Sequence, residues 1–169
     1  MISTLPLPAT IRAGWGEVLL RRADADDLEQ LVRLLSDDAI SASRGDRADP
    51  ADIERYAAAL DEVVADGSNE LVVGVDGTGE VVAMMQLTRI PGVSRRGATS
   101  LQIEAVRVGR ARRSGGLGSS MITWALDDAA RAVGAGLVQL TSDATRTDAH
   151  RFYEGLGFTA SHVGFKRQV

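Results

Sequence analysis

Residues 101–118 read LQIEAVRVGRARRSGGLG, a strand pattern followed by a run of arginines and glycines. The segment Leu101–Val108 alternates apolar and polar side chains, which is the period of a strand with one buried face. The glycine-rich segment Arg113–Gly118 follows, and an apolar helical pattern begins at Leu117. A helix start offers unpaired backbone N–H groups, and glycines let a phosphate approach them closely. The stretch therefore predicts a strand, a pyrophosphate-binding loop and a helix, in that order.

Arginines surround this loop. Arg110, Arg112 and Arg113 would supply charge-assisted donors for a ligand that carries several phosphate groups. The plainer alternative, in which the glycines only turn the chain and the arginines form a solvated face, stays open. A dinucleotide-binding fingerprint fits only in part, because Met121 stands where its third glycine belongs and too little chain follows Asp143 for the second half of such a fold. The P-loop is excluded, because no Gly-Lys-Ser or Gly-Lys-Thr occurs.

The chain before this stretch carries the patterns of strands and helices in alternation. Asp24 with Asp27 is an N-cap pattern, and Asp49-Pro50 is a second helix start. The segment 76–79, Asp-Gly-Thr-Gly, has the composition of a hairpin turn. The expected elements are a strand at 18–20, a helix over 28–35, a helix over 53–63, and paired strands at 71–75 and 81–85.

The chain after the loop predicts the rest of an α/β fold. We expect a long helix ended by 134–136, a buried parallel strand at 137–140, a last helix over 147–153 and a closing strand pair at 158–160 and 163–165. Residues 1–16, with two prolines, are expected to be an irregular leader, and residues 17–169 a single domain. The predicted fold class is α/β with a mixed, mostly antiparallel sheet flanked by helices on both faces.

Composition limits the chemistry. The chain of 169 residues has no cysteine and two histidines, His150 and His162, which excludes disulfides, thiolate zinc sites and a three-histidine metal site. We assign neither histidine to a metal. A net charge of -4 argues against a nucleic-acid-binding protein. No apolar run reaches the roughly 20 residues that cross a bilayer, and the start lacks a signal-peptide pattern, so we expect a cytoplasmic protein without membrane contacts.

Two motifs together resemble the GNAT superfamily of acetyl-CoA-dependent N-acetyltransferases. Its signature R-x-x-G-x-G/A is present as Arg113, Gly116 and Gly118, between a strand and a long helix. The segment 149–158, Ala-His-Arg-Phe-Tyr-Glu-Gly-Leu-Gly-Phe, is similar to the family's A-x-x-x-Y-x-x-L-G-F. The resemblance covers roughly residues 17–168, and the stretch 148–166 is most similar to small-molecule members such as aminoalkylphosphonate N-acetyltransferases.

The resemblance implies the GNAT acyltransferase fold and acetyl-CoA as co-substrate, with no metal. In the family, the pyrophosphate of coenzyme A lies on backbone N–H groups of the signature loop, and the pantetheine arm pairs like an added strand with the strand before it. Many members also have an asparagine near the start of the last helix; here Arg146 is the candidate to replace it. The cofactor-binding residues that the resemblance implies are Val106, Arg107, Val108, Arg113, Ser114, Gly115, Gly116, Leu117, Gly118, Ser119 and Arg146.

The resemblance also implies direct transfer of the acetyl group to an amine, which needs a general base, a donor to the oxyanion and a general acid. Glu104 matches the family's frequent base position; its alternative is an exposed strand residue paired with an arginine. The Val106 N–H would face the oxyanion if the family's strand bulge occurs here. Tyr153 matches the tyrosine that protonates the coenzyme A sulfur; its alternative is a core aromatic residue.

The acceptor is the least constrained partner. In the family, the loops that correspond to 36–49 and 89–97 wall the acceptor site, and here both carry mixed charges. Carboxylates at 37, 38 and 46 would attract a cationic amine, whereas arginines at 44, 47, 95 and 96 would hold a carboxylate or phosphonate; solvated loop charge is the alternative. We expect a small primary amine as acceptor and a possible homodimer through the apolar hairpin 71–87. The remaining alternatives are a non-catalytic acyl-CoA-binding module, a peptide or protein N-acetyltransferase, and another nucleotide-binding domain.

Overall fold

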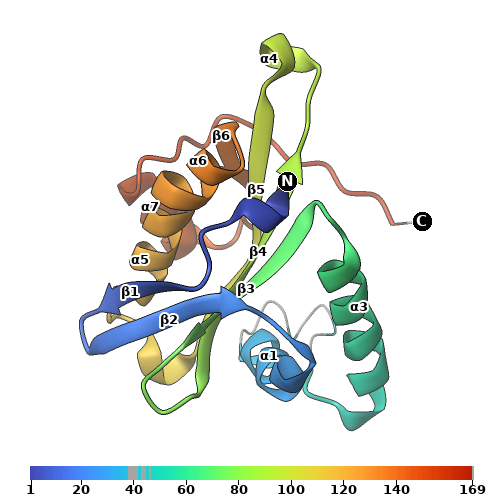
Figure 1. Cartoon of the computed structure of the whole chain (residues 1–169), viewed down its shortest axis with the longest axis vertical. Helices are drawn as coiled ribbons and strands as arrows, with labels where there is room; N and C mark the ends of the chain where they lie inside the picture. The colour runs from blue at the N-terminus through green and yellow to red at the C-terminus, as the bar shows by residue number, and fades with distance from the viewer. Residues whose placement is uncertain (38–41, 43–44, 46, 169) are drawn as a thin grey trace.

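The computed structural model describes residues 1–37, 42, 45 and 47–168. Its centre is a six-stranded sheet in the order β1-β2-β3-β4-β5-β6 (Figure 1). The strands are β1 (Ala9–Ala13), β2 (Gly16–Arg22), β3 (Asn69–Val75), β4 (Val81–Ile90), β5 (Thr99–Val108) and β6 (Ala135–Leu140). Neighbours pair antiparallel except β5 and β6, which are parallel. The predicted mixed, mostly antiparallel sheet is confirmed.

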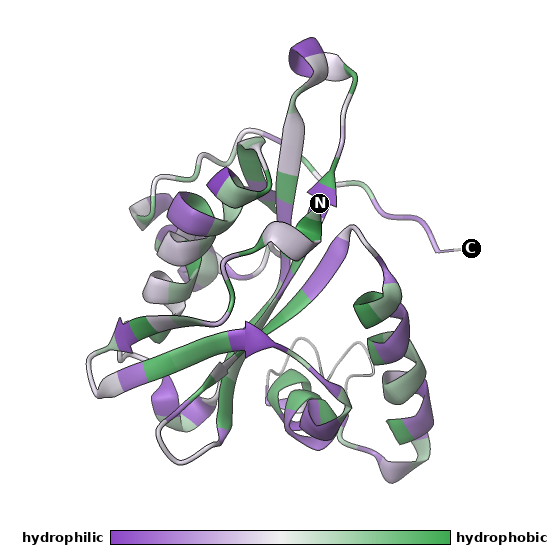
Figure 2. Cartoon of the chain, viewed as in Figure 1, coloured by the Kyte–Doolittle hydropathy of each residue, from purple (hydrophilic) through white to green (hydrophobic). Residues whose placement is uncertain are grey.

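Helices cover both faces of this sheet, as predicted. On one face lie α1 (Leu28–Ser36) and α3 (Ile53–Ala65); on the other lie α5 (Leu117–Trp124), α6 (Ala130–Ala132) and α7 (Thr147–Gly155) (Figure 1). A π-helical segment, Ala125–Ala129, joins α5 to α6. Each face has its own buried cluster, and Figure 2 shows hydrophobic residues along the central strands between the two helical layers. A short turn, α4 (Ser94–Gly97), caps the β4–β5 hairpin.

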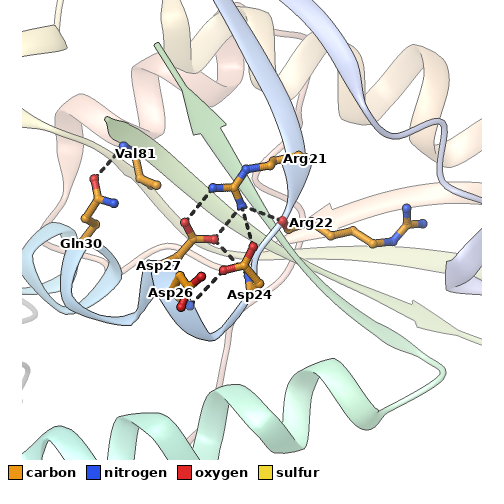
Figure 3. Close-up of polar contacts among 7 residues, drawn as sticks. All are labelled: Arg21, Arg22, Asp24, Asp26, Asp27, Gln30 and Val81. Carbon is orange, nitrogen blue, oxygen red and sulfur yellow. Dashed lines mark hydrogen bonds and ion pairs between the residues drawn. The ribbon is translucent and has the colours of Figure 1, made fainter. Parts of the chain in front are cut away.

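The corner between β2 and α1 is fixed by a buried ion pair (Figure 3). The Arg21 guanidinium donates to both carboxylate oxygens of Asp27 at 2.7 Å, and Asp27 is buried. Asp24 caps the turn as expected, since its side chain accepts from the Asp26 N–H while Asp27 accepts from the Asp24 N–H. Burial alone would raise the pKa of Asp27, but hydrogen bonds from Arg21 and the Asp24 N–H outweigh it and lower that pKa. The ion pair and the cap therefore tie β2 to the turn that begins α1.

The prediction of an irregular leader over residues 1–16 is wrong. Residues 9–13 form β1, which pairs with β2 along its whole length, from Ala9 opposite Leu20 to Ala13 opposite Gly16. Ile2 and Leu5 are almost fully buried in the core cluster on the α5 side. The prolines mark a local turn, but the apolar side chains before and after them gain burial only once the sheet is assembled, which a short pattern does not reveal.

The predicted closing strand pair is also wrong. Residues 158–160 and 163–165 form no strand, and the sheet of the described residues ends at β6. Phe158 packs on Tyr153 at 5.8 Å between ring centroids, but Val163 and Phe165 are 79% and 93% exposed. The alternating pattern gives this segment strand propensity, yet a strand needs a partner edge, and a lone short hairpin is marginal in water.

The apolar hairpin 71–87 does not provide a dimer surface. Its strands, β3 and β4, lie in the middle of the sheet, and Val72, Val73, Met85 and Leu87 are fully buried. The residues expected to meet a second copy form the core instead, because helices cover them on both faces. Within the described residues, no helix has the length and apolar character that a membrane crossing requires.

Candidate functional site

The loop from Arg113 to Gly118 has the geometry of an open backbone cradle. Ser114 and Gly116 take positive φ values of 64° and 76°, which turns successive N–H groups toward one side of the loop. Gly116 is the N-cap of α5 and supplies no side chain to cap it, so the first N–H groups of α5 have no side-chain acceptor there. A Cβ on Gly116 would meet nothing within 4 Å, so this side of the loop is open to a ligand.

The opposite side of the loop is closed by the β1–β2 turn. The Gly14 N–H donates to the Gly115 carbonyl at 2.7 Å, and the Trp15 indole lies directly on Gly115. A Cβ at Gly115 would come within 2.5 Å of Trp15 Cδ1, which no side chain could tolerate without a shift. The loop therefore has a packed back and an open front.

The three predicted phosphate donors are held by carboxylates of this chain. Arg112 donates to Asp76 at 2.6 Å and stacks over Trp15, so its guanidinium lies at the packed back of the loop. Arg112 is thus engaged by two partners of this chain, and its contact with a phosphate stays a prediction. Asp37, at the end of α1, accepts the Arg110 N–H at 2.9 Å and pairs with the Arg113 guanidinium at 3.7 Å.

The edge of β5 beside the loop is free of a neighbouring strand in the described part of the chain. The last pair between β5 and β6 is Ile103 opposite Leu140, whereas β5 continues to Val108. Beyond that point β5 pairs with β4 alone. The carbonyls of Val106 and Val108 accept side-chain N–H groups from Arg107 at 2.8 Å and Arg113 at 3.0 Å. The splayed strands leave a gap in the hydrogen-bond ladder that leads to the cradle.

A β-bulge lies where the strands separate. Met84 pairs with Arg107 and Gln86 with Glu104, so two residues of β5 stand opposite one of β4. Ala105 takes a positive φ of 49° at this point. The bulge expected from the family resemblance is thus present, and such an irregularity leaves a residue outside the ladder. Glu104, directly before it, is exposed.

Tyr153 on α7 is half-buried beside two arginines. Its ring packs edge-to-face on Phe152 at 5.0 Å, which agrees with the core-aromatic alternative. Burial raises the pKa of the Tyr153 phenol, and the charges of Arg107 and Arg146 act in the opposite sense. Tyr153 therefore lies within electrostatic range of both Arg107 and Arg146. The phenol stays protonated at neutral pH.

The other predicted cofactor-binding residues and the two histidines differ in which of their atoms a ligand could reach. Leu117 is buried, so only its backbone is available, while Gly118 lies against α7 and β5, where an added Cβ would make ordinary van der Waals contact with Phe152 and Val108. The Ser119 side chain lines a separate pocket of about 650 Å³ between β1 and α5. His150 binds the Asp143 carbonyl through Nε2 at 2.9 Å, and His162 contacts Ser161. Among the described residues, no group of three or more potential metal ligands is found.

The two loops expected to wall the acceptor are only partly described. Asp38, Arg44 and Asp46 lie outside the described residues. Arg95 and Arg96 lie on α4, at the far end of β5 from the cradle (Figure 1). These two arginines lie away from the cradle, and their role toward an acceptor stays a prediction.

Asp37, Asp76 and Trp15 are residues that sequence reasoning missed as partners of the loop. They come from three segments far from it in sequence, and each contacts it only through the tertiary fold. Asp76 was assigned only to a hairpin turn, and Asp37 only to the acceptor wall. No local pattern distinguishes either from other turn carboxylates.

Comparison with known proteins gives the family. A sequence profile described as the acetyltransferase (GNAT) family matches residues 28–158, which is most of the chain. The chain belongs to this family. The predicted enzyme class, a GNAT N-acetyltransferase, is confirmed at the level of the family, and the GNAT fold agrees with the six-stranded sheet.

Individual relatives agree with this membership of the GNAT family. The chain is 40% identical over 53 residues to the aminoalkylphosphonate N-acetyltransferase of Salmonella typhimurium; the match covers 31% of this chain and 34% of that protein. A solved transcriptional regulator from Bacillus halodurans has a TM-score of 0.84 and 41% identity, covering 90% of this chain and 99% of that one. A Trypanosoma brucei acetyltransferase has a TM-score of 0.71 and 25% identity over 90% and 99% of the two chains.

Proposed function

We propose that this GNAT protein transfers an acetyl group from acetyl-CoA directly to the primary amine of a small molecule. The observation that carries the proposal is the continuity of the open β5 edge, after Ile103, with the open front of the loop at Gly116. Such an edge fits an amide-containing arm, and such a loop fits a pyrophosphate. Acetyl-CoA supplies the thioester carbonyl that the amine attacks. Backbone groups of Val106 and Val108 would hold the arm, and N–H groups from Ser114 to Ser119 the pyrophosphate.

The proton transfers are assigned to residues on either side of the bulge. Glu104 takes a proton from the ammonium form of the acceptor, directly or through water, and has no hydrogen-bond or ion-pair partner among the described side chains that would compete. The Val106 N–H donates toward the developing oxyanion. The Tyr153 phenol, which burial keeps protonated at neutral pH, gives its proton to the departing thiolate. Arg146, whose charge acts on the Tyr153 phenol, contributes positive charge near the leaving group. No acyl-enzyme is involved, in keeping with a chain that has no cysteine.

The first experiment is thermal unfolding of the protein with acetyl-CoA, coenzyme A and NAD in parallel. A ligand at about 100 times Kd adds about 2.7 kcal/mol of stability, so acetyl-CoA and coenzyme A should raise the Tm and NAD should not. Release of free thiol is then measured over a panel of amines, beginning with aminoalkylphosphonates because of the Salmonella relative, then polyamines and peptides with a free N-terminus. No shift with acetyl-CoA or coenzyme A contradicts the proposal.

A non-catalytic acyl-CoA-binding module is the second candidate. It is favoured by the description of the 41% identical Bacillus halodurans protein as a transcriptional regulator. The net charge of -4 does not favour direct contact with nucleic acid. Saturable acetyl-CoA binding with no thiol release over the whole amine panel would select this candidate.

Two further expectations belong to the proposal. We propose a homodimer that uses the segment after α7, because Val163 and Phe165 are exposed there and the hairpin 71–87 is buried. Light scattering after size exclusion tests the dimer, and replacement of both residues by serine should yield the monomer. The cytoplasmic location stays a prediction, which cell fractionation would check.

A further inference from the structure

The Arg112 guanidinium is held by two partners, Asp76 and Trp15, at the packed back of the loop. Its terminal nitrogen donates to Asp76 at 2.6 Å, and its central carbon lies 4.5 Å from the centre of the Trp15 ring. Both contacts reach Arg112 from other parts of the fold: Asp76 follows β3, and Trp15 lies in the β1–β2 turn. An arginine held by a carboxylate and an aromatic face is fixed in orientation, since each partner restricts a different direction.

Asp76 is itself anchored. Its side chain is 3% exposed, and one carboxylate oxygen accepts the Thr78 hydroxyl at 2.6 Å, the Thr78 N–H at 2.9 Å and the Glu80 N–H at 3.2 Å. The other oxygen is left for Arg112. The hydrogen bonds from Thr78 lower the pKa of Asp76 although burial opposes this, so the carboxylate is ionised at neutral pH. The β3–β4 turn thus presents a rigid anion to Arg112.

Trp15 connects Arg112 to the loop, because its ring contacts both Arg112 and Gly115. Its ring lies under the Arg112 guanidinium, and its Cδ1 and Nε1 atoms lie against Gly115, where a Cβ would be 2.5 Å from Cδ1 and 2.6 Å from Nε1. The neighbouring Gly14 N–H binds the Gly115 carbonyl. The back of the loop is therefore shaped by the same ring that Arg112 holds in place.

We propose that Asp76, Arg112 and Trp15 form a brace that sets the shape of the pyrophosphate loop, with Arg112 as a positioning residue rather than a phosphate ligand. This inference rests on the proposed use of the loop to bind coenzyme A. Its consequence is selective: the brace affects recognition of the pyrophosphate and leaves the thioester chemistry at β5 unchanged. The competing role, a direct Arg112–phosphate contact, predicts a different response to loss of Asp76.

Two acetyl donors separate these possibilities. Acetyl-CoA carries the pyrophosphate, and S-acetylpantetheine has the same thioester arm without it. The variants are Arg112→Gln, Asp76→Asn and both together; Asn keeps the carbonyl oxygen for Thr78 and Glu80. Arg131→Gln, at an exposed arginine on α6, is the control for loss of one positive charge.

Both single variants should lower kcat/KM for acetyl-CoA between about tenfold and a hundredfold, through KM, while kcat/KM for S-acetylpantetheine changes by less than about twofold. The double variant should be no worse than the worse single one, because the two residues act as a unit. Equal losses with both donors would overturn the proposal in favour of general damage. Unchanged or tighter acetyl-CoA binding in Asp76→Asn, with weaker binding in Arg112→Gln, would overturn it in favour of a direct phosphate contact.

A second measurement needs no donor. Amide hydrogen exchange of residues 113–119 in the free protein should be faster in both brace variants and unchanged in Arg131→Gln, since the brace restrains the loop before any ligand binds. Unchanged exchange in both variants would contradict the proposal even if activity fell. Failure of the parent protein to bind coenzyme A at all would instead refute the proposed function, and the exchange result would still report on the brace.

Discussion

Glu104 and Tyr153 belong to opposite faces of the sheet. Ile103 is buried in the core on the α5 side, so Glu104, the next residue of β5, points to the face covered by α1 and α3. Tyr153 packs against the α5-side core. The gap between β5 and β6, which begins after the last pair of Ile103 and Leu140, connects the two faces. An amine on one face and a thioester arm on the other would therefore meet at the bulge.

Replacement of Glu104 by glutamine should lower kcat about a hundredfold at neutral pH, because the acceptor would no longer lose its proton to a carboxylate. The loss should shrink as pH rises, since free amine then forms without help. Initial rates against pH provide the measurement. Glu54→Gln, at an exposed carboxylate on α3, is the control. A loss in Glu104→Gln that is equal at every pH would argue against the base role.

Replacement of Tyr153 by phenylalanine should lower kcat by about a hundredfold with little change in KM for the donor. Because burial raises the pKa of Tyr153, the parent enzyme should keep its protonated acid up to pH about 10 and lose activity only above it. The same pKa shift affects folding. The contribution of the protonated Tyr153 to the free energy of unfolding is fully present below the ordinary phenol pKa and is lost as pH rises through the raised pKa of the folded protein. The other tyrosine, in Tyr56→Phe, serves as control. If kcat is unchanged, Tyr153 is only a packing residue.

Replacement of Gly115 by alanine should weaken coenzyme A binding at least about tenfold and lower the free energy of unfolding by about 1–2 kcal/mol, because its Cβ would collide with Trp15. Gly118→Ala is the matched comparison: its Cβ would lie 3.5 Å from Phe152, an ordinary contact, so affinity should change little. Calorimetric titration and chemical unfolding give the two quantities. Equal effects of the two substitutions would show that the packed back of the loop is unimportant.

Removal of the Asp27 carboxylate in Asp27→Ala should lower the free energy of unfolding by about 3 kcal/mol, since Arg21 would lose its buried partner. Because the pKa of Asp27 is lowered in the fold, its stabilisation is present above the ordinary carboxyl pKa of about 4 and is lost as pH falls through the lower folded value. The difference between parent and variant should therefore shrink in acid. Asp26→Ala, at an exposed neighbour, is the control in urea unfolding. A constant difference at all pH values would contradict this account.

The sequence alone determined the elements whose signals are local. The period of Leu101–Val108, the glycines of the loop and the cap at Asp24 each depend on neighbouring residues, so the strand, the cradle and the start of α1 followed from pattern and turn chemistry. The family resemblance added Glu104 and Tyr153. Burial of Ile2 and Leu5 was not predictable in this way, because their partners are distant in the chain.

Only the tertiary structure decided which charges are free to bind a ligand. Arg110, Arg112 and Arg113 look equivalent in sequence, yet Arg112 is committed to Asp76 and Trp15, and Asp37 binds the other two. The same holds for the segment 158–168, whose alternating pattern lacks a paired edge. A side chain's chemistry is set by its residue type, but its availability depends on carboxylates, rings and strand edges that folding brings from elsewhere in the chain.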